Sequence, residues 1–103
     1  MMKQAAVLLL AAGLVWGGEL QSERLFGPEV QTGPYKHPAS ITELASGDLY
    51  LVYYGGADEY AVNTGVFGSR WDHATKQWSA PKLIASDPFR SVGNGVIWQA
   101  PEI

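Results

Sequence analysis

The chain has 103 residues, of which 47% are hydrophobic and 17% are charged, and it contains no cysteine. This length allows at most one small domain, and the composition is that of a folded protein rather than a disordered one. A formal net charge of −3 offers no basic stripe for nucleic acid, and the absence of cysteine excludes disulfide bonds. Stability must therefore come from a packed core.

The first 17 residues have the pattern of a secretory signal peptide. Lys3 supplies a positive start, residues 5–15 form an uncharged apolar run, and Gly17 is a small residue suited to cleavage. The apolar run is shorter than the roughly 20 residues that a membrane-spanning helix needs. We expect residues 1–17 to be removed and the mature protein to be secreted or periplasmic, without a membrane anchor. A buried N-terminal helix is the alternative.

Residues 18–103 are predicted to form β structure throughout. Short runs rich in β-branched and aromatic residues alternate with turns rich in glycine, proline and aspartate, and no helical periodicity follows residue 20. In chain order, the expected strands cover 25–30, 39–44, 49–54 and 65–71, then an outermost strand that starts at 78 and continues through 82–85, then 95–99. The predicted fold class is all-β.

The strand expected at 49–54 has apolar or aromatic side chains on both faces. Leu49, Leu51 and Tyr53 would point to one face, and the alternate residues to the other. Such a strand is predicted to be buried on both sides, as in stacked sheets.

Several short motifs follow one another in a fixed order. They read His-Pro-Ala-Ser-Ile at 37–41, Gly-Asp-Leu-Tyr-Leu at 47–51, Tyr-Gly-Gly at 54–56, Ser-Arg at 69–70, Trp-Ser-x-Pro at 78–81 and Asn-Gly-Val-Ile-Trp-Gln-Ala-Pro at 94–101. This order resembles the N-terminal part of sialidase-like proteins with Asp-box (BNR) repeats. The resemblance implies that residues 18–103 are the first blade and the start of the second blade of a six-bladed β-propeller with its sugar site at the hub.

The Asp box of this family is altered here. Ser69, Asp72 and Trp78 occupy recognisable places, but the turn between them is longer and lacks the usual glycine. An aspartate in such a turn usually accepts hydrogen bonds from its own backbone. We therefore expect Asp72 to be structural rather than catalytic.

Lys36 and His37 precede Pro38, where the resemblance implies an arginine that would hold a substrate carboxylate. Lysine supplies a point charge and histidine a donor, but neither reproduces the bidentate geometry of a guanidinium group. We expect Lys36 and His37 to be substrate-binding residues. The alternative is a solvated Lys36 and a packed His37.

Asp58 and Glu59 follow Gly55-Gly56 in the loop where the resemblance implies the general acid/base. A carboxylic acid in a pocket can donate a proton to a leaving oxygen. Both residues are catalytic candidates, and simple solvation is the alternative for each. The resemblance implies a tyrosine nucleophile outside this chain.

Two functions fit these patterns. The first is the N-terminal fragment of a secreted sialidase-like glycosidase that acts on terminal sugars of glycans. The second is a non-catalytic β-propeller that binds glycans or proteins. In both cases the expected partner is a carbohydrate or protein. We expect no cofactor and no metal, because no set of His, Cys, Asp and Glu residues has metal-ligand spacing in the sequence, and the two histidines, His37 and His73, are far apart. The 103-residue fragment is expected to be inactive alone.

Overall fold

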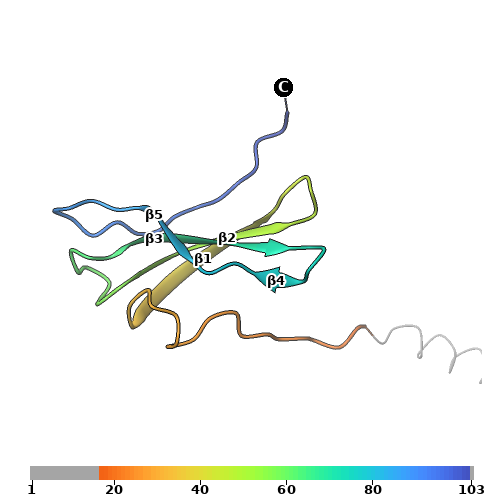
Figure 1. The fold of residues 1–103 in the computed structure, drawn as a ribbon, viewed down its shortest axis with the longest axis horizontal. Helices are drawn as coiled ribbons and strands as arrows, with labels where there is room; N and C mark the ends of the chain where they lie inside the picture. The colour runs from red at the N-terminus through yellow and green to blue at the C-terminus, as the bar shows by residue number, and fades with distance from the viewer. Residues whose placement is uncertain (1–16, 103) are drawn as a thin grey trace, which may run out of the picture.

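The computed structural model describes residues 17–102, so the predicted signal peptide lies outside this range except for Gly17. Five strands form one open antiparallel sheet. They are β1 (Tyr35–Glu43), β2 (Leu49–Gly56), β3 (Gly65–Asp72), β4 (Gln77–Trp78) and β5 (Lys82–Ala85). Strands β1, β2 and β3 are neighbours in that order, and β4 and β5 both pair with the outer edge of β3 (Figure 1). The prediction of an all-β fold is confirmed for the described residues.

Strand β2 lies at the centre of the sheet because its residues are apolar on both faces. Its last six residues, from Leu51 to Gly56, are all buried. The hairpin that leads into it turns at Gly47, whose φ of 89° is a backbone conformation that glycine adopts without strain. The prediction that this strand is buried on both sides is confirmed.

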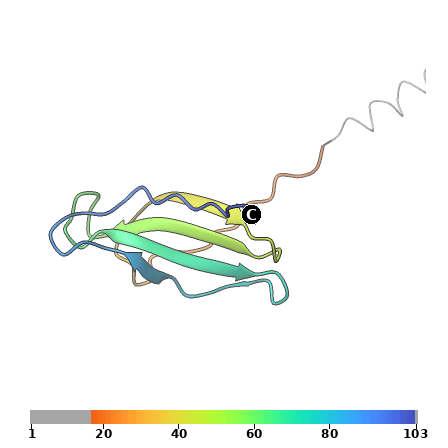
Figure 2. The same cartoon turned by 90° about the horizontal axis from the view of Figure 1, so that it is seen from above.

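One face of the sheet carries the core cluster of Val52, Tyr54 and Val66. The C-terminal segment crosses over this face in an extended conformation (Figure 2). Ile97 packs against the cluster, and its backbone N–H donates to the Ser40 hydroxyl at 3.3 Å. The segment therefore covers β1 and β2 through side chains rather than through a strand ladder.

The opposite face is covered by the N-terminal segment that precedes β1. The ring of Phe26 lies 5.8 Å from that of Tyr53 and 6.3 Å from that of Trp78. The hydroxyls of Thr32 and Tyr53 share a hydrogen bond of 2.9 Å. Tyr53 also stacks on Phe67 of β3, with 5.9 Å between the ring centroids. Aromatic contacts thus hold the N-terminal segment on the sheet.

Two expected strands are wrong. Residues 25–30 contain a turn instead, in which the N–H of Val30 donates to the carbonyl of Gly27 at 3.1 Å, and Pro28 lacks the N–H that a ladder would use. Residues 95–99 are extended but join no ladder. Strand β1 also begins four residues before the expected start at 39, because a bulge between Lys36 and Ala39 accommodates Pro38 within the strand.

Apolar side chains remain exposed on the molecule. Ile41 of β1 and Leu83 of β5 are each 54% exposed, and Val96 and Trp98 of the C-terminal segment are 84% and 72% exposed. Residues 17–102 include no helix that is long and apolar enough to cross a membrane.

Candidate functional site

The site is built where the start of β1 meets the end of β2. The rings of Tyr35, His37 and Tyr54 pack against one another. Their centroids are separated by 5.7 Å for Tyr35 and Tyr54, 6.1 Å for Tyr35 and His37, and 6.2 Å for His37 and Tyr54. Tyr35 pairs with Gly56 in the ladder, which is two residues from Tyr54, and His37 is two residues from Tyr35. The ordinary alternation of side chains along a strand therefore brings Tyr35 and His37 to the face that carries Tyr54.

Glu59 reaches the same place from the loop after β2. The hydroxyl of Tyr54 donates to Glu59 Oε1 at 3.4 Å. The Ser91 hydroxyl donates to the backbone carbonyl of Glu59 at 2.9 Å, which ties this loop to the segment after β5. Two of the four predicted site residues, His37 and Glu59, are therefore both neighbours of one buried tyrosine.

The hydroxyl of Tyr54 is held in its protonated form. The side chain of Tyr35 and burial each raise the pKa of Tyr54 above its usual value, and the nearby Glu59 carboxylate raises it further. A protonated hydroxyl is a hydrogen-bond donor, so Tyr54 can orient the Glu59 carboxylate.

Asp58 has a different environment from Glu59, although the two are adjacent. Its carboxylate accepts a hydrogen bond from the Glu59 N–H at 2.6 Å, and its carbonyl accepts one from the Thr64 hydroxyl. The Asp58 side chain is exposed, whereas Glu59 is half-buried. These contacts give Asp58 a role in shaping the loop.

Lys36 also lies apart from Tyr54. It pairs with Gly55 in the ladder, and because side chains alternate along a strand, it faces the side of the sheet opposite Tyr54. Its ammonium group donates to the carbonyl of Gly33 at 2.6 Å. Lys36 and His37 nevertheless both line a cavity of about 400 Å³, and neither Asp58 nor Glu59 lines it.

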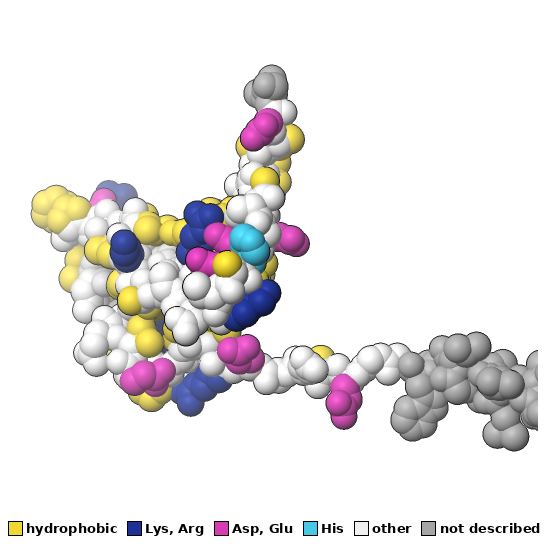
Figure 3. All heavy atoms as spheres, turned by 45° about the vertical axis from the view of Figure 1, so that its right-hand side comes forward, with side chains coloured by type: hydrophobic (Ala, Val, Ile, Leu, Met, Phe, Trp, Pro, Cys, Tyr) yellow, Lys and Arg dark blue, Asp and Glu magenta, His cyan; other side chains and the backbone are white. Residues whose placement is uncertain are grey.

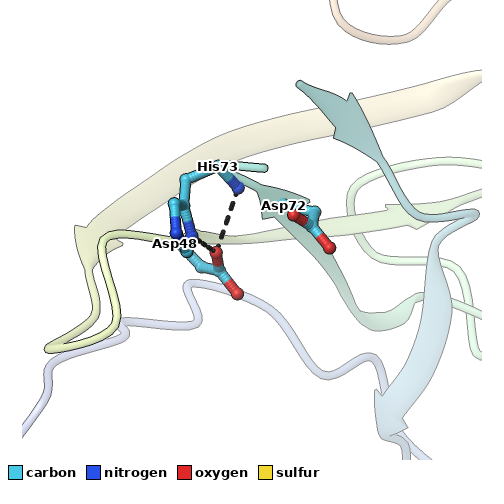
Figure 4. Close-up of side chains that lie close together, drawn as sticks. All are labelled: Asp48, Asp72 and His73. Carbon is cyan, nitrogen blue, oxygen red and sulfur yellow. Dashed lines mark hydrogen bonds and ion pairs between the residues drawn. The ribbon is translucent and has the colours of Figure 1, made fainter. Parts of the chain in front are cut away.

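A second polar cluster joins the β1–β2 turn, the end of β3 and the turn that follows β3. Asp48 Oδ2 accepts a hydrogen bond from Arg70 Nε at 2.7 Å. Asp48 Oδ1 accepts one from the backbone N–H of His73 at 3.0 Å and lies 2.5 Å from His73 Nδ1 (Figure 4). These contacts lower the pKa of Asp48: the His73 backbone N–H contributes most, followed by the His73 ring and Arg70. Figure 3 shows one face of the molecule, on which a histidine side chain lies beside acidic and basic side chains.

The ligand-type atoms of Asp48, Asp72 and His73 lie within 4.8 Å of one another. Both carboxylate oxygens of Asp48 already accept hydrogen bonds, and Asp72 Oδ1 accepts the backbone N–H groups of Ala74 and Thr75. The Arg70 guanidinium beside Asp48 also opposes a cation. The oxygens of this cluster are therefore engaged in hydrogen bonds that join the β1–β2 turn to the β3–β4 turn.

The expectation that Asp72 is structural is confirmed by its contacts. Its carboxylate caps the turn before β4, and Lys76 in that turn has a φ of 61° with its ammonium 4.9 Å from the ring centre of Trp71. The Ser69 hydroxyl donates to the carbonyl of Ser79 at 2.6 Å. These residues hold the β3–β4 turn together.

The sequence did not identify Tyr35 and Tyr54 as site residues. Tyr54 was expected in a buried strand and Tyr35 lay outside the expected strands, and the register of β1 on β2 brings the two rings together. In the sequence, Tyr35 follows Gly33-Pro34 and Tyr54 precedes Gly55-Gly56. A tyrosine beside glycines in both places was the available signal.

Comparison of the chain with known protein families, curated proteins and solved structures gives no match. The resemblance to sialidase-like proteins thus stays a prediction from the motifs.

Proposed function

We propose that this chain is the N-terminal part of a secreted sialidase-like glycosidase, and that the sheet is the first blade of a six-bladed β-propeller. Residues 1–17 would be the signal peptide, and residues 94–102 would begin the second blade. An antiparallel sheet with a central strand buried on both sides supports this assignment. The apolar outer side of the C-terminal segment, at Val96 and Trp98, supports a further layer there.

Within this proposal, Glu59 is the general acid/base and Asp58 is not. The observation that carries this choice is the contact of the Tyr54 hydroxyl with Glu59 Oε1. This contact gives the Glu59 carboxylate a hydrogen-bond donor on a buried side chain, and general acid/base catalysis depends on such positioning. Asp58, exposed and engaged with the backbone of its own loop, lacks this support.

His37 would contact the substrate beside Glu59. Its side chain is exposed, and its ring packs edge-on against Tyr54 with an interplanar angle of 85°. This packing orients the imidazole while leaving its nitrogens free to meet a hydroxyl or carboxylate of a sugar. We assign His37 a binding role.

A non-catalytic glycan- or protein-binding propeller is the second candidate. The residue before the β1 bulge is Lys36 rather than an arginine, and its ammonium is tied to Gly33 on the other face of the sheet. A carboxylate of a bound sugar would then lack a bidentate partner next to Glu59. This observation favours binding without hydrolysis of sialic acid.

The two candidates are distinguished by assaying a longer polypeptide that contains this chain. Release of aryl alcohol from fluorogenic glycosides would be measured alongside binding of sialyllactose and lactose. Hydrolysis above the rate of the buffer supports the glycosidase. Saturable glycan binding without any release supports the second candidate. If the polypeptide shows neither hydrolysis nor binding, both candidates are overturned.

A further inference from the structure

A pocket of about 470 Å³ opens between the N-terminal segment and the start of β1. Its lining contains two cationic side chains, Arg24 and Lys36, and the Glu29 carboxylate lies beside Arg24 over Gly27. His37 and Glu59 do not line this pocket, although Lys36 also lines a neighbouring cavity with His37. The function proposed above leaves it unassigned.

The lysine of the pocket is fixed in place. Lys36 is half-buried, and its ammonium donates one hydrogen bond to the Gly33 carbonyl at 2.6 Å. An ammonium group has three N–H donors, so two remain for a ligand. The side chain thus presents its charge from a defined position.

The arginine of the pocket lies over a glycine. A Cβ atom on Gly27 would stand 2.8 Å from a terminal nitrogen of Arg24 and would also meet the Glu29 carboxylate. Arg24 and Glu29 therefore converge above the bare backbone of Gly27, whose N–H donates to Glu29 Oε1 at 2.8 Å. Any larger residue at position 27 would displace both charged groups.

We propose that this pocket binds an oxyanion, a sulfate, phosphate or carboxylate group, between the Arg24 guanidinium and the Lys36 ammonium. A guanidinium group matches two oxygens of such an anion, and an ammonium group supplies a point charge. Neutral ligands could accept hydrogen bonds from these two groups but would lack the attraction between opposite charges. The site takes an anionic small molecule or an anionic group on a larger one.

Glu29 limits the affinity of this site. Hydrogen bonds from backbone N–H groups, first its own and then that of Gly27, lower the pKa of Glu29, and the charges of Arg24 and Lys36 lower it further. The carboxylate is therefore ionised at neutral pH and offsets part of the positive potential. Removing its charge should strengthen binding.

The test is titration of a longer polypeptide that contains this chain with sodium sulfate at constant ionic strength, followed by heteronuclear NMR. We expect saturable shifts near residues 24–36. R24Q and K36Q should each raise Kd about tenfold, which corresponds to a loss of about 1.4 kcal/mol of binding free energy. E29Q should lower Kd. The control K82Q removes an exposed lysine of β5 and should leave Kd unchanged.

Further arms identify the source of the oxyanion. Phosphate, acetate and sialyllactose are titrated in the same way, with lactose as the neutral counterpart of sialyllactose. Binding of sialyllactose but not lactose at this pocket assigns the anion to a glycan, and binding of inorganic anions alone assigns it to a free ion. Unsaturable shifts, or equal Kd values for wild type and R24Q, would overturn the inference. Arg24 is exposed, so the R24Q variant should fold and tests the oxyanion site even if K36Q fails to fold.

This inference does not rest on glycoside cleavage. A chain that binds sulfate with the expected pattern of variants but releases no sugar supports the pocket and counts against the proposed enzyme. The reverse outcome separates them equally well.

Discussion

Asp48 and Arg70, which are 22 positions apart, are joined by a hydrogen bond of 2.7 Å between Oδ2 and Nε. This contact fastens the β1–β2 turn to the end of β3. The side chain of Asp48 is only 11% exposed, whereas that of Arg70 is 51% exposed. Asp48 is therefore the centre of the cluster, and Arg70 is one of its two partners.

Replacing Asp48 should destabilise the fold more than replacing Arg70. D48N removes the charge that accepts hydrogen bonds from both Arg70 and His73, whereas R70Q removes one exposed partner. We expect D48N to lower Tm by several degrees and R70Q to lower it less. Thermal unfolding followed by circular dichroism gives both values, and a larger loss in R70Q would contradict the assigned roles.

The same cluster predicts a pH dependence. The pKa of Asp48 is lowered in the folded state, so its contribution to stability is fully present above the unfolded value of about 3.9. That contribution is lost as the pH falls below this value toward the lowered folded pKa. Wild type should therefore lose Tm between neutral and strongly acidic pH more steeply than D48N does. Parallel curves for the two proteins would show that Asp48 carries no such linkage.

Gly33 and Gly47 form a matched pair for testing backbone constraints. Both have positive φ, 87° and 89°. A Cβ on Gly47 would have only ordinary contacts with His73, so G47A should cost about 1–2 kcal/mol from the left-handed backbone alone. A Cβ on Gly33 would collide with the backbone of Gly56, so G33A should cost at least about twice as much. Urea denaturation measures both, and equal losses would refute the close approach.

Leu51 and Leu83 test how the packing differs between the central strand and the edge of the sheet. Leu51 of β2 is 7% exposed, and Leu83 of β5 is 54% exposed. L51A should reduce the free energy of unfolding by about 2–5 kcal/mol, as buried leucines do. L83A should stay within roughly 0.5 kcal/mol of wild type. A large loss in L83A would mean that something covers β5.

The central strands were predictable because their signals are local. The stretch from Leu49 to Tyr54 has apolar side chains on both faces, and few arrangements other than a buried strand suit it. The segment at 25–30 misled because leucine, phenylalanine and valine at Leu25, Phe26 and Val30 resemble a strand. They instead pack from a turn, and Phe26 reaches Tyr53 and Trp78 from outside the ladder.

The candidate site was predictable only in part. The loop after β2 was identified through Asp58 and Glu59, but the choice between them depends on Tyr54, whose hydroxyl reaches one carboxylate and not the other. That choice follows from strand register and loop geometry, which depend on contacts between distant residues. The hydrogen bond between Asp48 and Arg70 was not predicted from the sequence for the same reason.

The central claim is that Glu59 is the acid/base and that its neighbour Asp58 is not. The most direct measurement is the rate of glycoside release by E59Q and D58N in a longer polypeptide that contains this chain and is active as wild type. We predict that E59Q lowers kcat roughly 100-fold or more, the contribution typical of a general acid/base, while D58N stays within about twofold. Unchanged release by E59Q, or a larger loss in D58N than in E59Q, would contradict the account.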